Sequence, residues 1–366
     1  MLRKVYVEIT SRCNLHCGMC IRHVWQHTPQ DMPADLFRRL VEDLRGVPTL
    51  EAIQFGGFGE PLVHPQFFQF LRWTVEAGIP AEVLTNGVLL DGWAAAELVE
   101  LGLQRLIVSL DGPGPGGNGT FHTPAAGVVQ ANLRELYRQR LVRRARRPEV
   151  VIAFVASRRT LGELPALKRL GVHLGFSRIL VTNLIPYTPE LVQEILYGDW
   201  TTTRRGGQPS PWSPAVELPR MDWRPEVQEV VNRLQASGSH VLVGEGHLAG
   251  GQMYCRFAHE GFAVVGPDGS VSPCLPLLHT HSYYYRGTRR QVLAYSVGNI
   301  HEQPLSELWN TESYRNFRAR LIAFPFAPCI DCGGCDLRNS NEEDCHGNDF
   351  PVCGPCLWAA GLIQCP

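Results

Sequence analysis

Cysteine placement constrains this chain more than any other feature of its sequence. Of the 12 cysteines, three stand close together at Cys13, Cys17 and Cys20, and all the others lie from Cys255 onward. The first residues carry a charge at Glu8, where an export signal needs an apolar run, so we expect a reducing compartment. Disulfides are therefore a weak explanation for the cysteines, and metal or redox chemistry at two places in the chain is the stronger one.

The composition excludes several classes of protein. Hydrophobic residues make up 44% of the chain and charged residues 19%, which supplies a buried core and rules out a disordered protein. The net charge of -1 gives no general attraction to nucleic acid or to an anionic membrane. No apolar run reaches the roughly 18 residues of a membrane helix. We therefore expect a cytoplasmic protein with no nucleic-acid and no membrane partner, and the basic run 143–147 is typical of a solvated helix end.

Up to about residue 236 the hydrophobic pattern alternates between strand and helix. Continuous apolar runs predict buried strands, and amphipathic stretches predict helices. About six βα units in a row favour a parallel α/β barrel or an open sheet with right-handed crossovers. The predicted strands are 4–9, 50–55, 81–84, 105–110, 150–155 and 178–182, and the predicted helices are 33–45, 65–77, 92–101, 128–141, 161–170 and 225–236.

Two stretches interrupt this alternation. Residues 111–119 are rich in Gly and Pro and are predicted to form a loop. Residues 186–223 mix Pro, Gly, Thr and Trp, which fits either a lid over the mouth of a barrel or an insertion packed on its outside. After about residue 240 helical periodicity fades, so we expect metal clusters rather than a large hydrophobic core to stabilise the tail.

The first three cysteines form the motif Cys13-Asn-Leu-His-Cys17-Gly-Met-Cys20, just after the first predicted strand. This spacing on a loop lets three thiolates converge on one inorganic centre, and thiolates suit zinc or iron–sulfur. A closed structural site has four ligands, so three cysteines leave one metal open to an exogenous ligand, which indicates catalysis. The alternative is a structural site completed by His16 or His23.

Other short motifs follow the later strands. Gly56–Glu60 (GGFGE) follows the second strand, Asn86 follows the third, and Ser109 and Asp111 close the fourth. Because the carboxyl ends of barrel strands form the active-site mouth, we expect these groups to gather near the cysteine loop, with glycines letting the backbone approach a ligand. Asn86 and Asp111 also fit simple turn residues, and Glu60 fits a cap on the following helix.

These residues resemble the radical S-adenosylmethionine (SAM) enzymes. CNLHCGMC has that family's CxxxCxxC pattern and GGFGE resembles its GGE motif, in the family's order within residues 1–185. The resemblance implies a partial (β/α)6 TIM-type barrel with a [4Fe–4S] cluster on Cys13, Cys17 and Cys20 and with SAM chelated to the fourth iron. It also implies that an electron from the cluster cleaves SAM to methionine and a 5′-deoxyadenosyl radical, which abstracts a substrate hydrogen.

The same resemblance implies roles for side chains around SAM. Glu60 and the backbone of Gly57 hold the methionine amino group. Asn86 and Ser109 lie near its carboxylate or the ribose, and Asp111 is a further candidate at that place. Many family members carry an aromatic residue before the third cysteine, whereas Met19 stands there in this chain and supplies an apolar wall beside adenine.

The C-terminal cysteines resemble a SPASM domain, the accessory iron–sulfur module of many radical SAM maturases. Cys255 precedes a predicted hairpin, 262–265 and 270–272, that ends at Cys274. The later cysteines depart from the domain's CxxCx5CxxxC pattern, so one or two auxiliary [4Fe–4S] clusters are implied with their ligand pairing open. A zinc ribbon built from two CxxC pairs is the alternative. The candidate ligands are Cys255, Cys274, Cys329, Cys332, Cys335, Cys345, Cys353, Cys356 and Cys365.

Several stretches resemble one narrower group, the radical SAM/SPASM maturases associated with tungsten-containing oxidoreductases. They are residues 4–20, 56–65, 341–358 and 363–366. This resemblance implies a protein or peptide substrate, specifically a tungsten- or molybdenum-pterin oxidoreductase or its cofactor, and a reductant such as ferredoxin or flavodoxin. The expected domains are a core barrel over 1–185, an insertion or lid with the last barrel helix over 186–239, and a SPASM-like cluster domain over 240–366.

Two other functions stay open. One is a maturase that forms a thioether or carbon–carbon crosslink in a ribosomally synthesised peptide. Many such enzymes carry a leader-binding domain before the barrel, and Cys13 lies too near the start for one, which counts against this function. A separate leader-binding protein could take the place of that domain. The other is a non-enzymatic scaffold or electron carrier, which predicts no SAM cleavage. The segment 279–290, with its three tyrosines, fits either a substrate-facing loop or packing.

Overall fold

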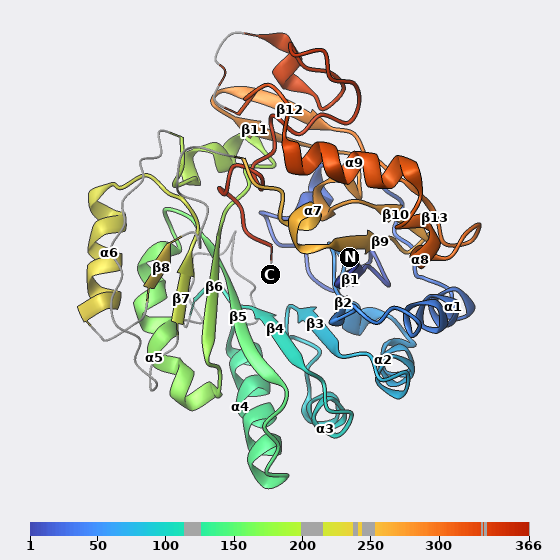
Figure 1. The fold of residues 1–366 in the computed structure, drawn as a ribbon. Helices are drawn as coiled ribbons and strands as arrows, with labels where there is room; N and C mark the ends of the chain where they lie inside the picture. The colour runs from blue at the N-terminus through green and yellow to red at the C-terminus, as the bar shows by residue number, and fades with distance from the viewer. Residues whose placement is uncertain are drawn as a thin grey trace. The chain divides into compact units, whose positions relative to one another are not determined.

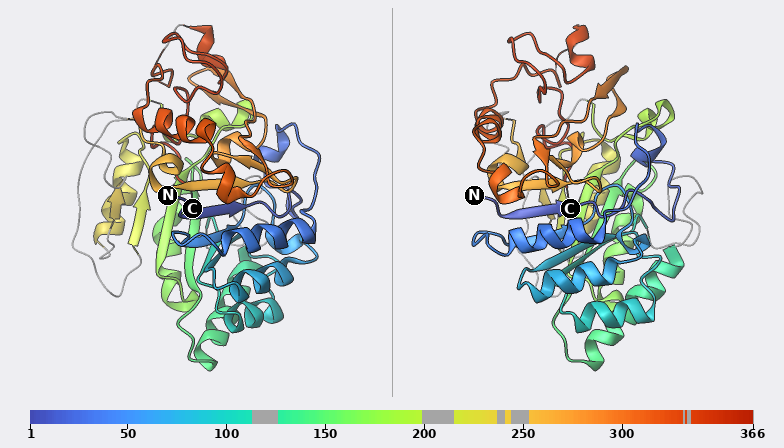
Figure 2. Two further views of the ribbon diagram at one scale, coloured as in Figure 1. Left: turned by 45° about the vertical axis from the view of Figure 1, so that its right-hand side comes forward. Right: turned by 90° about the vertical axis from the view of Figure 1, so that its right-hand side faces the viewer.

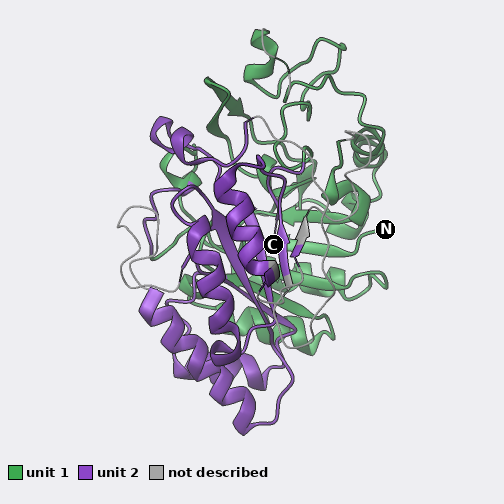
Figure 3. Ribbon diagram, turned by 90° about the vertical axis from the view of Figure 1, so that its left-hand side faces the viewer, with its two compact units in different colours: residues 1–14, 21–84, 253–360 green, residues 15–20, 85–252, 361–366 purple. Residues whose placement is uncertain are grey.

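The computed structural model describes residues 1–112, 126–198, 215–236, 241–243, 253–330, 332 and 335–365. Most of the predicted Gly- and Pro-rich loop and residues 199–214 of the candidate lid lie outside these ranges. Within the same candidate lid, Ala215–Leu218 instead form a strand that pairs in parallel with Arg178–Asn183, so this part belongs to the sheet, and the lid stays a prediction for the rest. Within them, no helix has the length and apolar character needed to cross a membrane. The chain divides into two compact units, coloured in Figure 3: unit 1 is Met1–Asn14, Ile21–Leu84 and Met253–Ala360, and unit 2 is Leu15–Cys20, Thr85–Gln252 and Gly361–Pro366.

Unit 1 is built on a sheet in which both ends of the sequence meet. β1 pairs in parallel with β2 on one side and with β9 on the other, so a strand from the C-terminal region extends the N-terminal sheet. β9 turns into β10 as the predicted hairpin, and β10 pairs with β13. The strands are β1 (Lys4–Val7), β2 (Ala52–Phe55), β3 (Ala81–Thr85), β9 (Phe262–Val265), β10 (Ser270–Ser272) and β13 (Gly298–Asn299), with a separate hairpin of β11 (His281–Tyr285) and β12 (Thr288–Val292).

The first two α-helices of unit 1 bury one apolar stripe each. In α1 (Ala34–Leu44) the buried residues are the predicted ones, and Phe37 stacks on Phe70 of α2 (Phe67–Glu76) with ring centroids 4.3 Å apart. The two helices lie side by side next to β1–β3 in Figure 1. The other helices are η1 (Ile21–His23), η2 (Pro61–Val63), α7 (Arg256–Glu260), η5 (Leu275–Leu277), α8 (Leu305–Leu308), α9 (Glu312–Ala323) and η6 (Asp336–Asn339).

Unit 2 is a parallel sheet in chain order, β4-β5-β6-β7-β8. Its helices lie along one face of these strands in Figure 3, as crossover connections require. The strands are β4 (Arg105–Ser109), β5 (Glu149–Ala156), β6 (Arg178–Asn183), β7 (Ala215–Leu218) and β8 (Val241–Val243), and the helices are α3 (Gly92–Glu100), α4 (Ala126–Val142), η3 (Leu161–Glu163), α5 (Leu164–Leu174), η4 (Pro189–Glu194) and α6 (Pro225–Ala236).

The predicted parallel α/β alternation is confirmed, with element ends displaced by a few residues. The longest helix that was not predicted from the sequence is α9. It packs near α7 (Figure 2). It buries only Tyr314, Phe317 and Leu321, so its apolar stripe is too thin to stand out. The hydroxyl of Thr311 caps its start by accepting the amide of Tyr314, 3.4 Å away.

Candidate active site and metal centres

In unit 1 the loops that follow β1 and β2 lie against each other. The amide of Glu60 donates to the carbonyl of Arg12 over 2.8 Å. A Cβ on Gly59 would stand 1.9 Å from the carbonyl oxygen of Thr10, so only glycine allows this approach. The GGFGE turn is therefore fastened to the stretch that leads directly into Cys13.

Glu8, just after β1, shapes the GGFGE turn from inside the protein. Its side chain is 1% exposed. Oε1 accepts the amides of Phe58 and Gly59 over 2.6 and 3.2 Å, and Oε2 accepts Nε2 of His279 over 2.5 Å. A Cβ on Gly57 would stand 2.7 Å from Oε1, so this glycine also makes room for the carboxylate. Three donors thus compensate the burial of Glu8.

Aromatic rings surround His279 beside this carboxylate. Its ring centroid lies 4.2 Å from that of His27, 4.8 Å from that of Trp25 and 5.8 Å from that of Phe58. Burial lowers the pKa of His27 and the neighbouring His279 lowers it further, against the opposing effect of Glu8. Nε2 of His27 lies 2.9 Å from the hydroxyl of Ser11.

Glu8 and His27 were not predicted as site residues, and His279 was predicted only as the first residue of the segment 279–290. A charged residue such as Glu8 at the end of an apolar strand signals a buried, paired carboxylate. His27 and His279 carry no comparable signal, because their proximity arises from the tertiary fold.

The predicted SAM-binding residues also have structural roles. The carboxylate of Glu60 is buried and accepts the amide of Leu62 over 3.1 Å, so it caps the short helix η2 rather than the predicted helix 65–77. In unit 2, Oδ1 of Asn86 accepts the amide of Val88 over 3.0 Å in a turn. Their roles toward SAM stay predictions.

Asp111 and Ser109 lie where β4 ends. Asp111 is 7% exposed, and its Oδ1 accepts the amide of Val155 on β5 over 2.8 Å. Burial raises the pKa of Asp111 to about 7, against the opposing effect of the Val155 amide. Ser109 is the last residue of β4, pairs in register with Ala153 and is half-buried.

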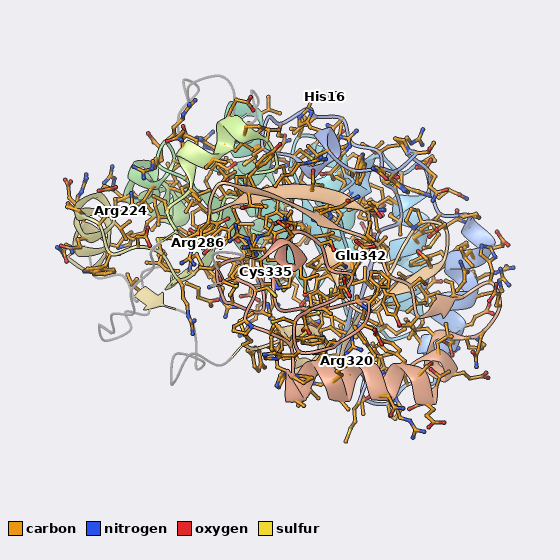
Figure 4. All side chains as sticks on the ribbon, turned by 90° about the horizontal axis from the view of Figure 1, so that it is seen from above. His16, Arg224, Arg286, Arg320, Cys335 and Glu342 are labelled. Atoms are coloured by element: carbon orange, nitrogen blue, oxygen red, sulfur yellow. The ribbon has the colours of Figure 1, made fainter. Side chains whose placement is uncertain are left out.

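The N-terminal cysteines lie on a loop that straddles the boundary in the chain between the two units. Cys13, Cys17, Cys20 and Met19 are half-buried, and the amide of Cys20 donates to the carbonyl of Cys17 over 3.0 Å. His16, labelled in Figure 4, is exposed on this loop. All 12 cysteines lie in the described part, and none forms a disulfide.

Eight of the C-terminal cysteines belong to unit 1, and seven of these interact electrostatically in two sets. Burial raises the pKa of Cys274 well above its ordinary value, and Cys255, Cys356 and Cys353 add to that shift. Burial also raises the pKa of Cys329 to about 11, with added contributions from Asp344, Cys345 and Cys332. The first set is therefore Cys255, Cys274, Cys353 and Cys356, and the second is Cys329, Cys332 and Cys345.

Among the described residues, no three His, Cys, Asp or Glu side chains lie close enough together to hold a single metal ion. The cysteines of a [4Fe–4S] cluster each bind a different iron, so they lie farther apart than the ligands of one ion. Buried thiols in sets of this kind are suitable donors for such clusters.

Asp344 orders the loop that carries Cys345. Its carboxylate is buried and accepts the amides of Ala327, His346 and Asn348 over 3.0–3.1 Å. Burial by itself raises the pKa of Asp344, but these hydrogen bonds outweigh burial, so the pKa lies below its ordinary value.

Segment 279–290 is a hairpin whose tyrosines mainly pack. Tyr283 and Tyr285 are buried, and the hydroxyl of Tyr283 donates to the carbonyl of Pro355 over 2.8 Å. Tyr284 is half-buried. Packing is therefore confirmed for two of the three tyrosines.

The last residues of the chain lie at the carboxyl end of β6 within unit 2. Nδ2 of Asn183 donates to the carbonyl of Leu362 over 2.8 Å, and the amide of Gln364 donates to the hydroxyl of Thr182 over 3.1 Å. Cys365 is buried there and, unlike the other C-terminal cysteines, belongs to unit 2.

Similarity to known proteins establishes the family. Residues 7–155 match the Radical SAM superfamily, and residues 255–336 match the SPASM iron-sulfur cluster-binding domain. The tungsten-containing aldehyde ferredoxin oxidoreductase cofactor-modifying protein of Pyrococcus furiosus is 32% identical over 369 residues, which cover 100% of this chain and 97% of that protein.

Solved structures agree in fold. SuiB of Streptococcus suis bound to precursor peptide SuiA matches with a TM-score of 0.61 and 14% identity, covering 91% of this chain and 70% of that one. AnSMEcpe with bound AdoMet matches with a TM-score of 0.57 and 16% identity, covering 92% and 88%. The chain therefore belongs to the radical SAM superfamily, as an enzyme with a SPASM domain and with SAM and [4Fe–4S] clusters as its cofactors.

Proposed function

We propose that this enzyme modifies a tungsten- or molybdenum-pterin oxidoreductase, or the cofactor of such an enzyme. The main support is the similarity over the whole chain to the cofactor-modifying protein of P. furiosus. The chemistry rests on one observation, the fastening of the GGFGE turn to the loop that leads into Cys13 through the Glu60–Arg12 hydrogen bond. We further propose a cytoplasmic location and a reduced ferredoxin or flavodoxin as the electron donor.

In this proposal Cys13, Cys17 and Cys20 hold the SAM-binding cluster. That cluster, when bound, supplies the electron that splits SAM into methionine and the 5′-deoxyadenosyl radical. The carboxylate of Glu60 and the backbone of Gly57 hold the methionine amino group. The remaining contacts to SAM come from Met19 beside adenine and from Asn86, Ser109 and Asp111 around the carboxylate and ribose.

The auxiliary clusters are assigned to two quartets of cysteines. The thiols of each set influence one another electrostatically, which supports the grouping. Cys335 completes the second set because it continues the spacing of Cys329 and Cys332. The first quartet is Cys255, Cys274, Cys353 and Cys356, and the second is Cys329, Cys332, Cys335 and Cys345; Cys365 stays outside both. The SPASM-like domain is then proposed for residues 240–366, after the core barrel over 1–185 and the insertion and last helix over 186–239.

Iron analysis tests the cluster assignment. Protein purified and reconstituted without oxygen is expected to hold about twelve irons, corresponding to three four-iron clusters. Cys353→Ser and Cys345→Ser are each expected to lose about four irons, whereas Cys365→Ser keeps them all. Bound zinc in place of iron at these cysteines would support the zinc ribbon instead.

A turnover assay tests the reaction. With SAM and dithionite the protein is expected to form 5′-deoxyadenosine, and Cys17→Ala is expected to form none. Equal product from both proteins would support the non-enzymatic scaffold.

The substrate is tested by supplying candidates to the same assay. Addition of a pterin oxidoreductase in its unmodified form is expected to stimulate 5′-deoxyadenosine formation and to yield a mass change in the oxidoreductase or its cofactor. The structural similarity to SuiB bound to its precursor peptide favours peptide crosslinking as the second candidate. Stimulation by a small precursor peptide alone would favour that alternative.

A further inference from the structure

Arg290, on β12, is a buried cation without a carboxylate partner among the described residues. It is 1% exposed. Nη2 donates to the carbonyl of Cys329 over 3.2 Å, and the side chain also interacts with Tyr283, its cross-strand partner. Nε and Nη1 have no hydrogen-bond partner within the described part of the chain. Its guanidinium also lies 5.1 Å from the centroid of the Tyr285 ring.

This arrangement is costly unless an anion accompanies it. A guanidinium stays charged at any ordinary pH and carries five N–H donors. Burial of an unpaired charge is unfavourable, and the contact with the Tyr285 ring offsets only part of that cost. The site therefore calls for negative charge close to Arg290.

The acidic side chain that acts on Cys329 among the described residues, Asp344, is already occupied. Asp344 interacts electrostatically with Cys329, but its oxygens accept the amides of Ala327, His346 and Asn348. The second cysteine set is a source of negative charge at this place, because Arg290 binds the backbone of Cys329 directly.

We propose that Arg290 is the internal counter-ion of the auxiliary cluster on Cys329, Cys332, Cys335 and Cys345, and that it raises the reduction potential of this cluster. The inference rests on the quartet assigned under the proposed function. Four thiolates give a four-iron cluster a net negative charge that grows on reduction, so a buried cation favours the reduced state. Nε and Nη1 are available as donors to sulfur, and hydrogen bonds to cluster sulfurs act in the same direction.

A second arginine supports the placement of this cluster beside β12. Nη1 of Arg338 donates to the carbonyl of Cys332 over 2.7 Å, and Nη2 donates to the hydroxyl of Thr288 over 2.8 Å. Thr288 begins β12, so both arginines link this strand to the segment that carries the cysteines. Arg338 is half-buried, and solvent therefore screens its charge more than that of Arg290.

The test is a redox titration of the full-length protein, reconstituted without oxygen and followed by electron paramagnetic resonance. Arg290→Gln is expected to favour the oxidised state of the second auxiliary cluster at least tenfold, a fall of about 59 mV in its midpoint potential. Arg290→Lys keeps the charge and is expected to shift the potential less. Arg289→Gln is the matched control, because Arg289 is an exposed neighbour on the same strand, and we expect it to leave the potential unchanged.

The iron content of each variant makes the outcome decisive. Arg290→Gln with full iron and an unchanged potential overturns the inference. If Arg290→Gln loses about four irons, retention of these irons by Arg290→Lys supports a counter-ion, and their loss from both variants overturns it. If Cys345→Ser removes no iron from the otherwise native protein, the quartet is wrong and the inference fails with it. That result leaves the SAM-cleavage proposal intact, since 5′-deoxyadenosine formation is measured separately.

Discussion

The role of a buried polar residue in this protein can be inferred from its hydrogen-bond partners. Glu8 has donors for both carboxylate oxygens, and one of these is His279, which lies 271 residues away in the chain. The GGFGE turn therefore owes its shape to a carboxylate outside the motif. Arg290 is the opposite case, since two of its nitrogens have no hydrogen-bond partner among the residues that the structure describes.

Loss of the Glu8 charge is expected to destabilise the protein. Glu8→Gln keeps an acceptor for the amides of Phe58 and Gly59 but removes the charge-assisted bond to His279, so we expect a loss of about 2 kcal/mol in the free energy of unfolding. Urea denaturation of the reconstituted protein measures it. The matched control is Glu51→Gln, whose ion pair with Arg3 is exposed and is expected to contribute little. Equal stability of the two variants would contradict the structural role of Glu8.

Asp111 is expected to make stability depend on pH. The folded state holds a proton on Asp111 up to about pH 7, whereas an unfolded Asp loses it near pH 4. The folded state thus binds more protons in this window, and the free energy of unfolding falls as pH rises through it, by at most about 1.4 kcal/mol per pH unit. Above pH 7 both states are ionised and the dependence on this group ends.

Asp111→Asn separates this contribution from the rest of the protein. Asparagine keeps an acceptor for the Val155 amide but does not titrate. The free energy of unfolding of Asp111→Asn, relative to that of the wild type, should therefore increase from pH 4 to pH 7 and then level off. Denaturation midpoints at several pH values measure this difference. A constant difference between the two proteins would show that the folded-state pKa of Asp111 is ordinary.

At the scale of elements, the sequence predicts those helices and hairpins that a local pattern of residues defines. The stripe of α1 and the β9–β10 hairpin appear as expected, because periodicity and a Pro-Asp-Gly turn define them within a few residues. The helix α9 was missed because most of its residues face solvent or the Cys-rich segment. For example, Arg320, labelled in Figure 4, donates to the carbonyl of Asp349 over 2.9 Å.

Gly59, in the turn after β2, packs so closely against Thr10 that the effect of substituting it can be predicted. Gly59→Ala forces a Cβ against the Thr10 carbonyl, so we expect it to separate the two loops, destabilise the protein and weaken SAM binding measured by equilibrium dialysis. Gly127→Ala is the control. Gly127 lies in α4 with no atom within 4 Å of its added Cβ, so alanine is expected to stabilise the protein by about 0.5–1 kcal/mol. Unchanged SAM affinity in Gly59→Ala would place the SAM site elsewhere.

At the scale of the whole chain, the sequence motifs predicted which residues carry chemistry but not how distant segments meet. The cysteine motifs and GGFGE pointed to a radical SAM/SPASM enzyme, which the family matches confirm. The pairing of β9 with β1 was not predicted, because no local pattern specifies a partner more than 250 residues away. The Glu8–His279 and Arg290–Cys329 contacts were also not predicted, because each joins segments that no local sequence pattern connects.

Removal of iron is expected to affect the chain unevenly. In β1 and β9 the side chains of Val5, Val7 and Val264 are fully buried, so apolar packing holds these strands without metal. Residues 325–360 contain only the short η6 among their described residues, and scattered bonds such as that from the Ile330 amide to the Gly354 carbonyl hold their backbone. Beside the buried side chains of this segment, such as Ile330 and Leu357, we expect the clusters to supply part of its order.

Hydrogen exchange with and without iron measures this difference. After anaerobic chelation we expect amides of residues 325–360 to exchange much faster, while amides of β1 and β9 keep their protection, because local opening follows the loss of local contacts. Cys353→Ser, which lacks a ligand of only the first proposed quartet, should accelerate exchange in part of the segment. If iron removal released β1 and β9 at the same rate as residues 325–360, the clusters would instead be integral to the N-terminal sheet, and the SPASM region would not be a separately stabilised part of the fold.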